Sequence, residues 1–183
     1  MKDKNYEWLK SALFLIGLVV VLVAVRLFIF TPVVVKGDSM DPTLQDGERV
    51  IALLNTKVKR FDIVTFPAPD EPDKYYIKRV IGLPGDTVSY QNDQLLINGK
   101  KVAEPYLNEY KKDLTDGMPL TLSPNQEASF KFEKVPVGKI LVLGDNRRIS
   151  KDTRSIGFID EKTVSGDVKF VFWPLKEIGF INK

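Results

Sequence analysis

A single apolar run, Ser11 to Phe30, constrains this chain more than any other feature. As a helix, its twenty residues would be roughly 30 Å long, which matches the hydrocarbon thickness of a bilayer. A cleavable secretory signal has a shorter apolar stretch, of about 7 to 15 residues, that ends in a small-x-small site. This run ends in Val25-Arg26-Leu27-Phe28-Ile29-Phe30 and lacks such a site. We therefore expect a retained transmembrane helix over residues 11–30, with a cleaved signal or a buried core helix as alternatives.

The charges beside the run indicate its orientation. Basic residues outnumber acidic ones ahead of it, which favours a cytoplasmic N-terminus under the positive-inside rule. The residues concerned are Lys2, Lys4 and Lys10 against Asp3 and Glu7. Residues 1–10 would then be cytoplasmic and residues 31–183 extracytoplasmic. Arg26 lies near the far end of the run, where its long side chain can reach the interface, so we expect it to mark the membrane boundary.

Composition narrows the chemistry that the remaining residues can perform. The chain has no histidine and no cysteine, so disulfides, thiol nucleophiles and most zinc sites are excluded, and we expect no metal and no cofactor. The net charge is only +3, and basic residues are interspersed with acidic ones, so no nucleic-acid partner is expected. About 150 residues follow the run, enough for one domain with a small subdomain.

Short segments of strand type, separated by turn residues, predict a predominantly β fold. The predicted strands are Thr31–Val35, Arg49–Leu54, Phe61–Phe66, Tyr75–Ile81, Thr87–Tyr90, Gln94–Ile97, Ile140–Leu143 and Asp167–Trp173. Gln91-Asn92-Asp93 and Asn98-Gly99 are typical of hairpin turns, and we expect them to mark a small β subdomain. Glu104 to Pro136 is rich in charge and proline and is predicted to be a loop-rich excursion, so residues 87–136 form a subdomain or insertion.

Ser39 follows the apolar run closely, within Lys36-Gly37-Asp38-Ser39-Met40-Asp41-Pro42-Thr43-Leu44. Without histidine, a base for this serine must be a Lys, Asp, Glu or Tyr. A lysine can serve only if burial or nearby positive charge lowers its pKa from about 10.4 to about 7 or 8. Strand alternation places Lys78 beside Tyr76 and Val80. Since the chain has 27 basic residues, this pattern alone does not select Lys78 over an ordinary strand lysine.

A third segment changes this balance. Gly144-Asp145-Asn146-Arg147-Arg148-Ile149-Ser150-Lys151-Asp152-Thr153-Arg154 follows a predicted strand and is rich in hydroxyl and charged side chains. Alone it could be a polar turn. However, the chain has three motifs in order behind an apolar anchor: the Ser39 segment, the segment from Tyr76 to Asp86, and this segment. In this arrangement the chain resembles the bacterial type I signal peptidases of the Gram-positive form.

The resemblance implies roles for individual residues. Ser39 would be the nucleophile and Lys78 the general base of a Ser-Lys dyad. Ser150 would hydrogen-bond the Lys78 amine, while Asp152 would pair with Arg79 and Arg154 as structural support. The Ser39 backbone N–H would supply one oxyanion donor. Gly37 stands where some relatives carry a serine donor, and Thr153 replaces a usual serine, a change that we expect to be tolerated.

The resemblance also implies the substrate and the location. The enzyme would be a single-pass protein of the bacterial cell membrane that removes signal peptides from preproteins after a small-x-small motif, with no obligate protein partner. The substrate would be extended beside a strand, in shallow pockets. The predicted lining residues are Val33, Val35, Met40, Leu44, Tyr76 and Ile77.

Two other functions remain open at the level of sequence. One is a specialised peptidase that processes pilin-like or surface substrates. The other is a non-catalytic, membrane-tethered β module in which Ser39 merely occupies a turn. An inactive paralogue is disfavoured because Ser39, Lys78, Ser150 and Asp152 are all retained.

Overall fold

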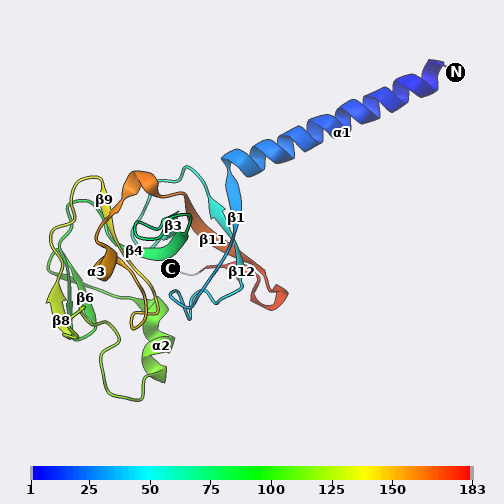
Figure 1. Cartoon of the computed structure of the whole chain (residues 1–183). Helices are drawn as coiled ribbons and strands as arrows, with labels where there is room; N and C mark the ends of the chain where they lie inside the picture. Colours follow the sequence, from blue (N-terminus) through cyan, green and yellow to red (C-terminus); the bar gives the residue numbers. More distant parts are fainter. Residues whose placement is uncertain (1, 182–183) are drawn as a thin grey trace.

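The computed structural model describes residues 2–181, with side chains from residue 6 onward. α1 (Lys2–Phe28) projects as a single rod from the folded part of the chain (Figure 1). Its segment Tyr6–Phe28 has a mean hydropathy of 2.7 in its most apolar window, and none of that window is buried within the described chain. So much exposed apolar surface is unfavourable in water, so α1 is a candidate membrane span.

The helix differs from the predicted span at both ends. It begins at Lys2 rather than residue 11, and Lys10 Nζ donates to Glu7 Oε1 across one turn of the polar extension. It ends at Phe28 because the next carbonyl, that of Ile29, accepts from Leu54 N and the chain enters a sheet. Pro32 lacks the N–H that a continuing helix would need.

A large antiparallel sheet follows, in the order β1-β2-β11-β3-β4-β9-β10, with β12 paired to β11. Its strands are β1 (Phe30–Val34), β2 (Arg49–Leu53), β3 (Ile63–Pro67), β4 (Tyr75–Gly82), β9 (Lys139–Leu143), β10 (Ile159–Asp160), β11 (Gly166–Trp173) and β12 (Gly179–Phe180). The predicted strands are confirmed to within a few residues, whereas the two-residue strands β10 and β12 are too short to give a pattern. Short helices connect these strands: α3 (Thr153–Ile156), η2 (Glu161–Thr163) and η3 (Leu175–Glu177).

The register of β4 leaves half of one edge open. β3 pairs with it from Tyr75 to Arg79, so that Lys78 lies opposite Val64. On the other edge β9 begins its pairing only at Arg79, opposite Leu143. Among the described residues, the edge from Tyr75 to Lys78 therefore has no β9 partner, and β1 likewise pairs only with β2. These two edges are free to hydrogen-bond an added strand.

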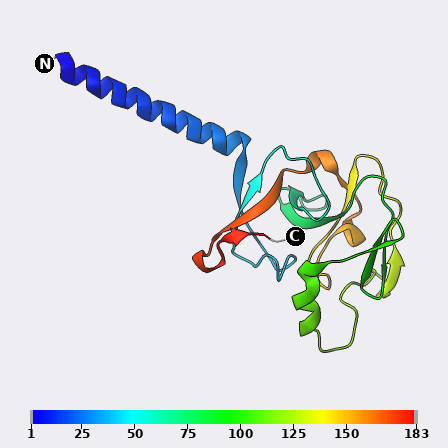
Figure 2. The same ribbon diagram turned by 180° about the vertical axis from the view of Figure 1, so that it is seen from behind.

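The predicted subdomain is a second antiparallel sheet, in the order β7-β6-β5-β8, on the side of the domain away from α1 (Figures 1 and 2). Its strands are β5 (Val88–Gln91), β6 (Gln94–Ile97), β7 (Lys100–Val102) and β8 (Ser129–Lys131). Positive φ angles at Asn92 (46°), Asp93 (65°), Asn98 (53°) and Gly99 (77°) confirm both predicted hairpin turns.

The excursion from Glu104 to Pro136 is more ordered than the sequence predicted. It contains η1 (Pro105–Leu107), α2 (Asn108–Asp113) and β8. Leu107 and Leu120 are fully buried, and the Asp93 carboxylate accepts from the backbone N–H groups of Leu120 and Thr121. The excursion is thus fastened to the β5–β6 turn by contacts between residues distant in sequence, which local patterns do not reveal.

Three apolar clusters form the core. One lies between β1, β2 and β11, a second joins β4 and β9 to the small sheet, and the third packs beneath β3, β4 and β9. Ile140 lies in the third cluster and is fully buried, with Val64 and Val80 in the same cluster.

We expect Ile140→Ala to lower the free energy of unfolding by about 2 to 5 kcal/mol, because it leaves a cavity in a closed cluster. Val137→Ala is the matched control, since Val137 is 95% exposed three residues away and should change stability little. Urea unfolding of both variants in detergent measures the difference. Equal losses would contradict the assignment of Ile140 to the core.

Candidate active site

Ser39 lies in a tight connection that returns the chain from β1 to β2. Gly37, at φ 77°, donates its N–H to Asp46 Oδ1 at 2.7 Å, and Met40 and Leu44 fill the core beneath. The Ser39 carbonyl accepts from Asn146 N at 3.1 Å. The backbone of Ser39 is therefore fixed by a residue from the third segment.

Lys78 reaches Ser39 from β4. Its Nζ lies 2.6 Å from Ser39 Oγ, and the residue is 3% exposed. The Nζ atom also lies 5.3 Å from the centre of the Tyr76 ring, so the predicted neighbour is present. Two residues that are 39 positions apart in sequence are thus in hydrogen-bond contact within a nearly dry environment.

Burial lowers the pKa of Lys78 from 10.5 to about 8, while the negative charges of Asp152 and Asp145 oppose this shift. With a pKa of about 8, about a tenth of the molecules carry a neutral amine at pH 7, against fewer than about one in a thousand for an ordinary lysine. The neutral amine has a lone pair that can accept a proton, as a general base requires.

The third segment supplies Asp145, which pairs with the neighbour of Lys78. Arg79 Nη2 donates to Asp145 Oδ2 at 2.6 Å and Arg79 Nε donates to Oδ1 at 2.9 Å, with both side chains fully buried. Thr43 Oγ1 donates to the same carboxylate at 2.5 Å. Asp145 therefore joins all three predicted motifs.

This geometry corrects one predicted pairing. Asp152 binds Arg154, whose Nη2 donates to Oδ2 at 2.8 Å, as predicted, but Arg79 pairs with Asp145 instead. Asp152 Oδ2 also accepts from Gly144 N and therefore holds the loop from within. Thr153 Oγ1 accepts from Val142 N, so the threonine that replaces the usual serine still provides a hydroxyl that binds the backbone of β9. The two carboxylates are seven residues apart in one loop, and sequence could not decide which one faces Arg79.

Ser150 also differs from its predicted role. Its Oγ is buried and has no hydrogen-bond partner within the described residues, so it does not bind the Lys78 amine. It packs instead against Gly144, where an added Cβ would lie 2.1 Å from Ser150 Oγ and 2.4 Å from Ser39 O. Gly144 is therefore required for the close approach of the third segment to Ser39.

A cavity of about 540 Å³ opens beside Ser39 and Lys78, between the end of β1 and the start of β4. Five of the six predicted lining residues contribute to it: Val33, Val35, Met40, Tyr76 and Ile77. The prediction for Leu44 is wrong, because Leu44 N donates to Met40 O in a turn that directs its side chain into the core, where it is fully buried.

Sequence reasoning missed the acidic wall of this cavity. Glu71, Asp73 and Lys74 line it from the loop before β4, and Tyr75 lines it from the first position of that strand. Tyr76 Oη donates to Glu71 Oε1 at 2.6 Å, and Lys151 of the third segment pairs with Asp70 and Glu71. These acidic residues directly precede the predicted strand that carries Lys78, and this position in the sequence could have identified them as part of the cavity.

Comparison with known proteins decides the family. The model of the family described as signal peptidase, peptidase S26, matches residues 6–173. The chain belongs to this family. It is 46% identical over 183 residues to signal peptidase I of Bacillus licheniformis, covering 97% of this chain and 93% of the relative. It is 44% identical over 189 residues to signal peptidase IB of a Staphylococcus aureus strain, covering 98% and 95%.

A solved structure agrees. The crystal structure of a signal peptidase I from Enterococcus faecalis matches with a TM-score of 0.55 and 38% identity, covering 61% of this chain and 97% of that one. Signal peptidases of this family are membrane-associated serine peptidases, and the chain is an enzyme of this class. The predicted fold class is confirmed by the same match.

Across residues 6–181, whose side chains the structure describes, no three histidine, cysteine, aspartate or glutamate side chains gather in a way that could hold a metal ion. The acidic groups near the signal peptidase site are used otherwise, since Asp145 and Asp152 both bind arginines.

The low pKa of Lys78 should appear in the pH dependence of stability. The native pKa of about 8 is lower than that of the unfolded chain, about 10.4, so between these values the unfolded state binds more protons. The free energy of unfolding should therefore rise with pH across this window, by about 3 kcal/mol in total, and the gain should be lost below about pH 8.

We expect Lys78→Met to remove this rise. Denaturant unfolding of both proteins between pH 7 and 10.5 gives the free energy of unfolding at each pH. Subtracting the value for the variant from that for the wild type cancels the contributions of the other titrating groups. The same pH dependence in both proteins would contradict a strongly depressed lysine.

Proposed function

We propose that Ser39 is the nucleophile and Lys78 the general base of a signal peptidase that cuts exported preproteins after a small-x-small motif. The observation that carries this proposal is the 2.6 Å contact between Ser39 Oγ and the buried Lys78 Nζ. In a chain without histidine, this is the pairing of nucleophile and base that serine peptidase chemistry needs.

The reaction proceeds through an acyl-enzyme. Neutral Lys78 takes the Ser39 hydroxyl proton as Oγ attacks the scissile carbonyl carbon, and the resulting ammonium gives that proton to the departing amine. Lys78, neutral again, then takes a proton from water, which attacks the ester, and it returns that proton to Ser39 Oγ as the acyl bond breaks. One lysine thus serves both halves of the reaction.

The Ser39 backbone N–H is the first oxyanion donor. It donates to no other acceptor within the described chain, so it is free for the developing charge. A lost donor of this kind costs about 3 to 4 kcal/mol of transition-state stabilisation. Gly37 supplies no side-chain donor, and its backbone N–H is already bound to Asp46.

The preprotein binds extended in the 540 Å³ cavity. The open edge of β4 from Tyr75 to Lys78 offers backbone groups to an added strand, and the residues after β1 face it across the cavity. Val33, Met40 and Ile77 limit the depth available to substrate side chains. In an extended peptide alternate side chains point into the cavity, so the two small residues of a small-x-small motif would enter it while the residue between them faces solvent.

Replacing Ser39 by alanine or Lys78 by methionine should lower kcat by at least about 10³-fold. The nucleophile and its base act as one catalytic unit, so the loss of either residue removes most of the rate enhancement that the pair provides. Cleavage of a precursor with an Ala-x-Ala site, measured in vesicles, tests this. Ser89→Ala and Lys139→Met, both on strands outside the cavity, are matched controls.

Wild-type kcat/KM should rise with pH through about 8. A tethered binding module, by contrast, predicts no cleavage at all.

We also propose that α1 crosses the cell membrane once, with the N-terminus in the cytoplasm and the catalytic domain outside. The anchor then places enzyme and preprotein in one bilayer, which raises their effective concentration. The small basic surplus ahead of the span supports this orientation.

Single cysteines can test the orientation, because the chain has none of its own. In intact cells, a membrane-impermeant maleimide should label Val137→Cys, which replaces a residue that is 95% exposed, and should not label Lys4→Cys until the membrane is permeabilised. The reverse pattern would overturn the orientation.

A further inference from the structure

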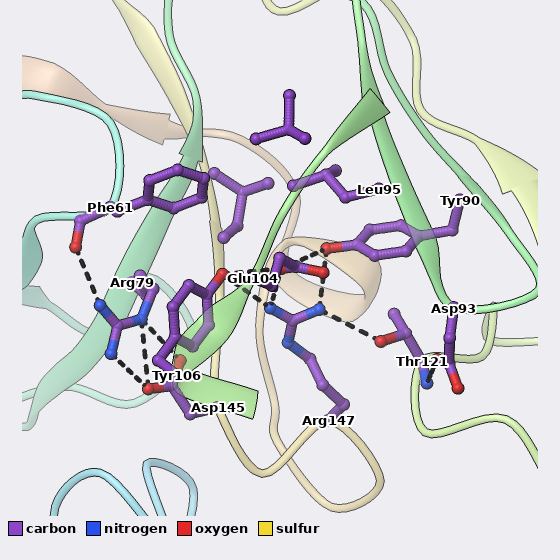
Figure 3. Close-up of polar contacts among 12 residues, drawn as sticks. Phe61, Arg79, Tyr90, Asp93, Leu95, Glu104, Tyr106, Thr121, Asp145 and Arg147 are labelled. Carbon is purple, nitrogen blue, oxygen red and sulfur yellow. Dashed lines mark hydrogen bonds and ion pairs between the residues drawn. The ribbon is translucent and has the colours of Figure 1, made fainter. Parts of the chain in front are cut away.

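The excursion between β7 and β9 places two tyrosines behind the active site, on the side away from the substrate cavity. Tyr106 belongs to η1 and Tyr110 to α2, and neither lines the substrate cavity. Figure 3 shows Tyr106 between the two buried arginines Arg79 and Arg147. Nothing in the proposed reaction uses these residues directly.

Tyr106 covers the ion pair behind Lys78. Its ring centre lies 3.8 Å from the Arg79 guanidinium carbon, which is close enough for a strong cation–π contact. The other sides of the guanidinium are held by Asp145 and by the Phe61 carbonyl, at 3.0 Å from Nη1. The Phe61 ring also packs on Tyr106, with centres 5.7 Å apart. The ring therefore completes the enclosure of a fully buried charge pair.

A second ion pair fixes the Tyr106 hydroxyl (Figure 3). Tyr106 Oη donates to Glu104 Oε1 at 2.6 Å, and Arg147 Nη2 donates to the same carboxylate oxygen at 2.5 Å. Arg147 Nε donates to the Gly144 carbonyl at 3.0 Å. Although burial alone would raise the pKa of Glu104, the charge of Arg147 holds that pKa below its ordinary value, so Glu104 is ionised. Tyr106 is thus tied to the loop that holds Asp145.

Tyr110 acts on the other half of the dyad. Its Oη donates to Asn146 Oδ1 at 2.7 Å, and Asn146 N donates to the Ser39 carbonyl at 3.1 Å. A hydrogen bond from α2 therefore orients the residue that holds the backbone of Ser39.

We propose that Tyr106 and Tyr110 are positioning residues for the Ser39–Lys78 pair, Tyr106 by sealing the Arg79–Asp145 ion pair behind Lys78 and Tyr110 by orienting Asn146 behind Ser39. This inference rests on the assignment of Lys78 as the general base. It gives the excursion a function in the reaction without contact with the preprotein.

The two tyrosines should have separable effects on the kinetics. Without the Tyr106 ring, water can reach Arg79 and Asp145, so Lys78 is less strongly desolvated and Asp145 less fully neutralised. The charged or titratable groups around Lys78 are Asp145, Asp152 and Tyr76, and the same cavity is also lined by Lys36, Glu71, Asp73 and Lys74. Greater hydration and a less neutralised Asp145 both favour the protonated lysine. The pH at which kcat/KM reaches half of its maximum should therefore be higher in a variant without the Tyr106 ring.

The experiment compares Tyr106→Leu with Tyr106→Phe in the full chain, by measuring kcat/KM against pH on an Ala-x-Ala precursor in vesicles. We expect the rising limb of Tyr106→Leu to move upward by about one pH unit, a loss of about tenfold at pH 7 that is recovered at high pH. Tyr106→Phe keeps the ring over Arg79 and should keep the wild-type limb. Phe132→Leu is the matched control, because Phe132 is a partly buried aromatic of the same subdomain that packs on Phe130.

An unmoved limb in Tyr106→Leu, or an equal shift in Phe132→Leu, would overturn the role of Tyr106. Tyr110→Phe removes one hydroxyl from a half-buried ring and should fold even if Tyr106→Leu does not. It should lower kcat several-fold with KM and the pH limb unchanged, and an unchanged kcat would overturn the role of Tyr110. If Lys78→Met retains activity, the base assignment itself fails, which is a distinguishable outcome.

Discussion

The buried ion pair between Arg79 and Asp145 is the constraint on which the site depends. Both side chains are fully buried, and such a pair is tolerated only when nearly every polar atom has a partner. Thr43, the Phe61 carbonyl and the Tyr106 ring complete that set. Because these partners come from four separate segments, satisfying one guanidinium brings the serine turn, the lysine strand and the third segment together.

The same dry interior determines the chemistry of Lys78. A charged pair survives there because its charges neutralise each other, whereas Lys78 contacts the Ser39 hydroxyl instead of a carboxylate and releases its proton more readily. A histidine base would titrate near neutral pH without such burial. A chain that uses lysine as its base therefore has to bury it, and Lys78, which is 3% exposed beside Ser39, meets that requirement.

Local patterns predicted most of the fold, since strand alternation and turn residues act within a few positions of each other. The three motifs were also recognisable in the sequence, as were five of the six cavity residues. What failed depends on contacts between residues distant in sequence: the partner of Arg79, the burial of Leu44 in the core, the Ser150 Oγ that has no hydrogen-bond partner among the described residues, and the helix α2. In α2, six residues without an apolar periodicity are held by tertiary contacts, so no local rule could have identified them.

The two faces of β4 explain why the insertion can assist the reaction without touching the substrate. Lys78 points to the cavity between β1 and β4, while Arg79 and Ile81 point to the side that carries the small sheet. The insertion leaves the chain after β4 and returns at β9, the strands that carry Lys78 and lead to Asp145, so its ends are fixed by their register. Changes to the substrate edge at β1 therefore need not disturb the environment of the lysine, and the insertion can tune that environment without altering which peptides fit.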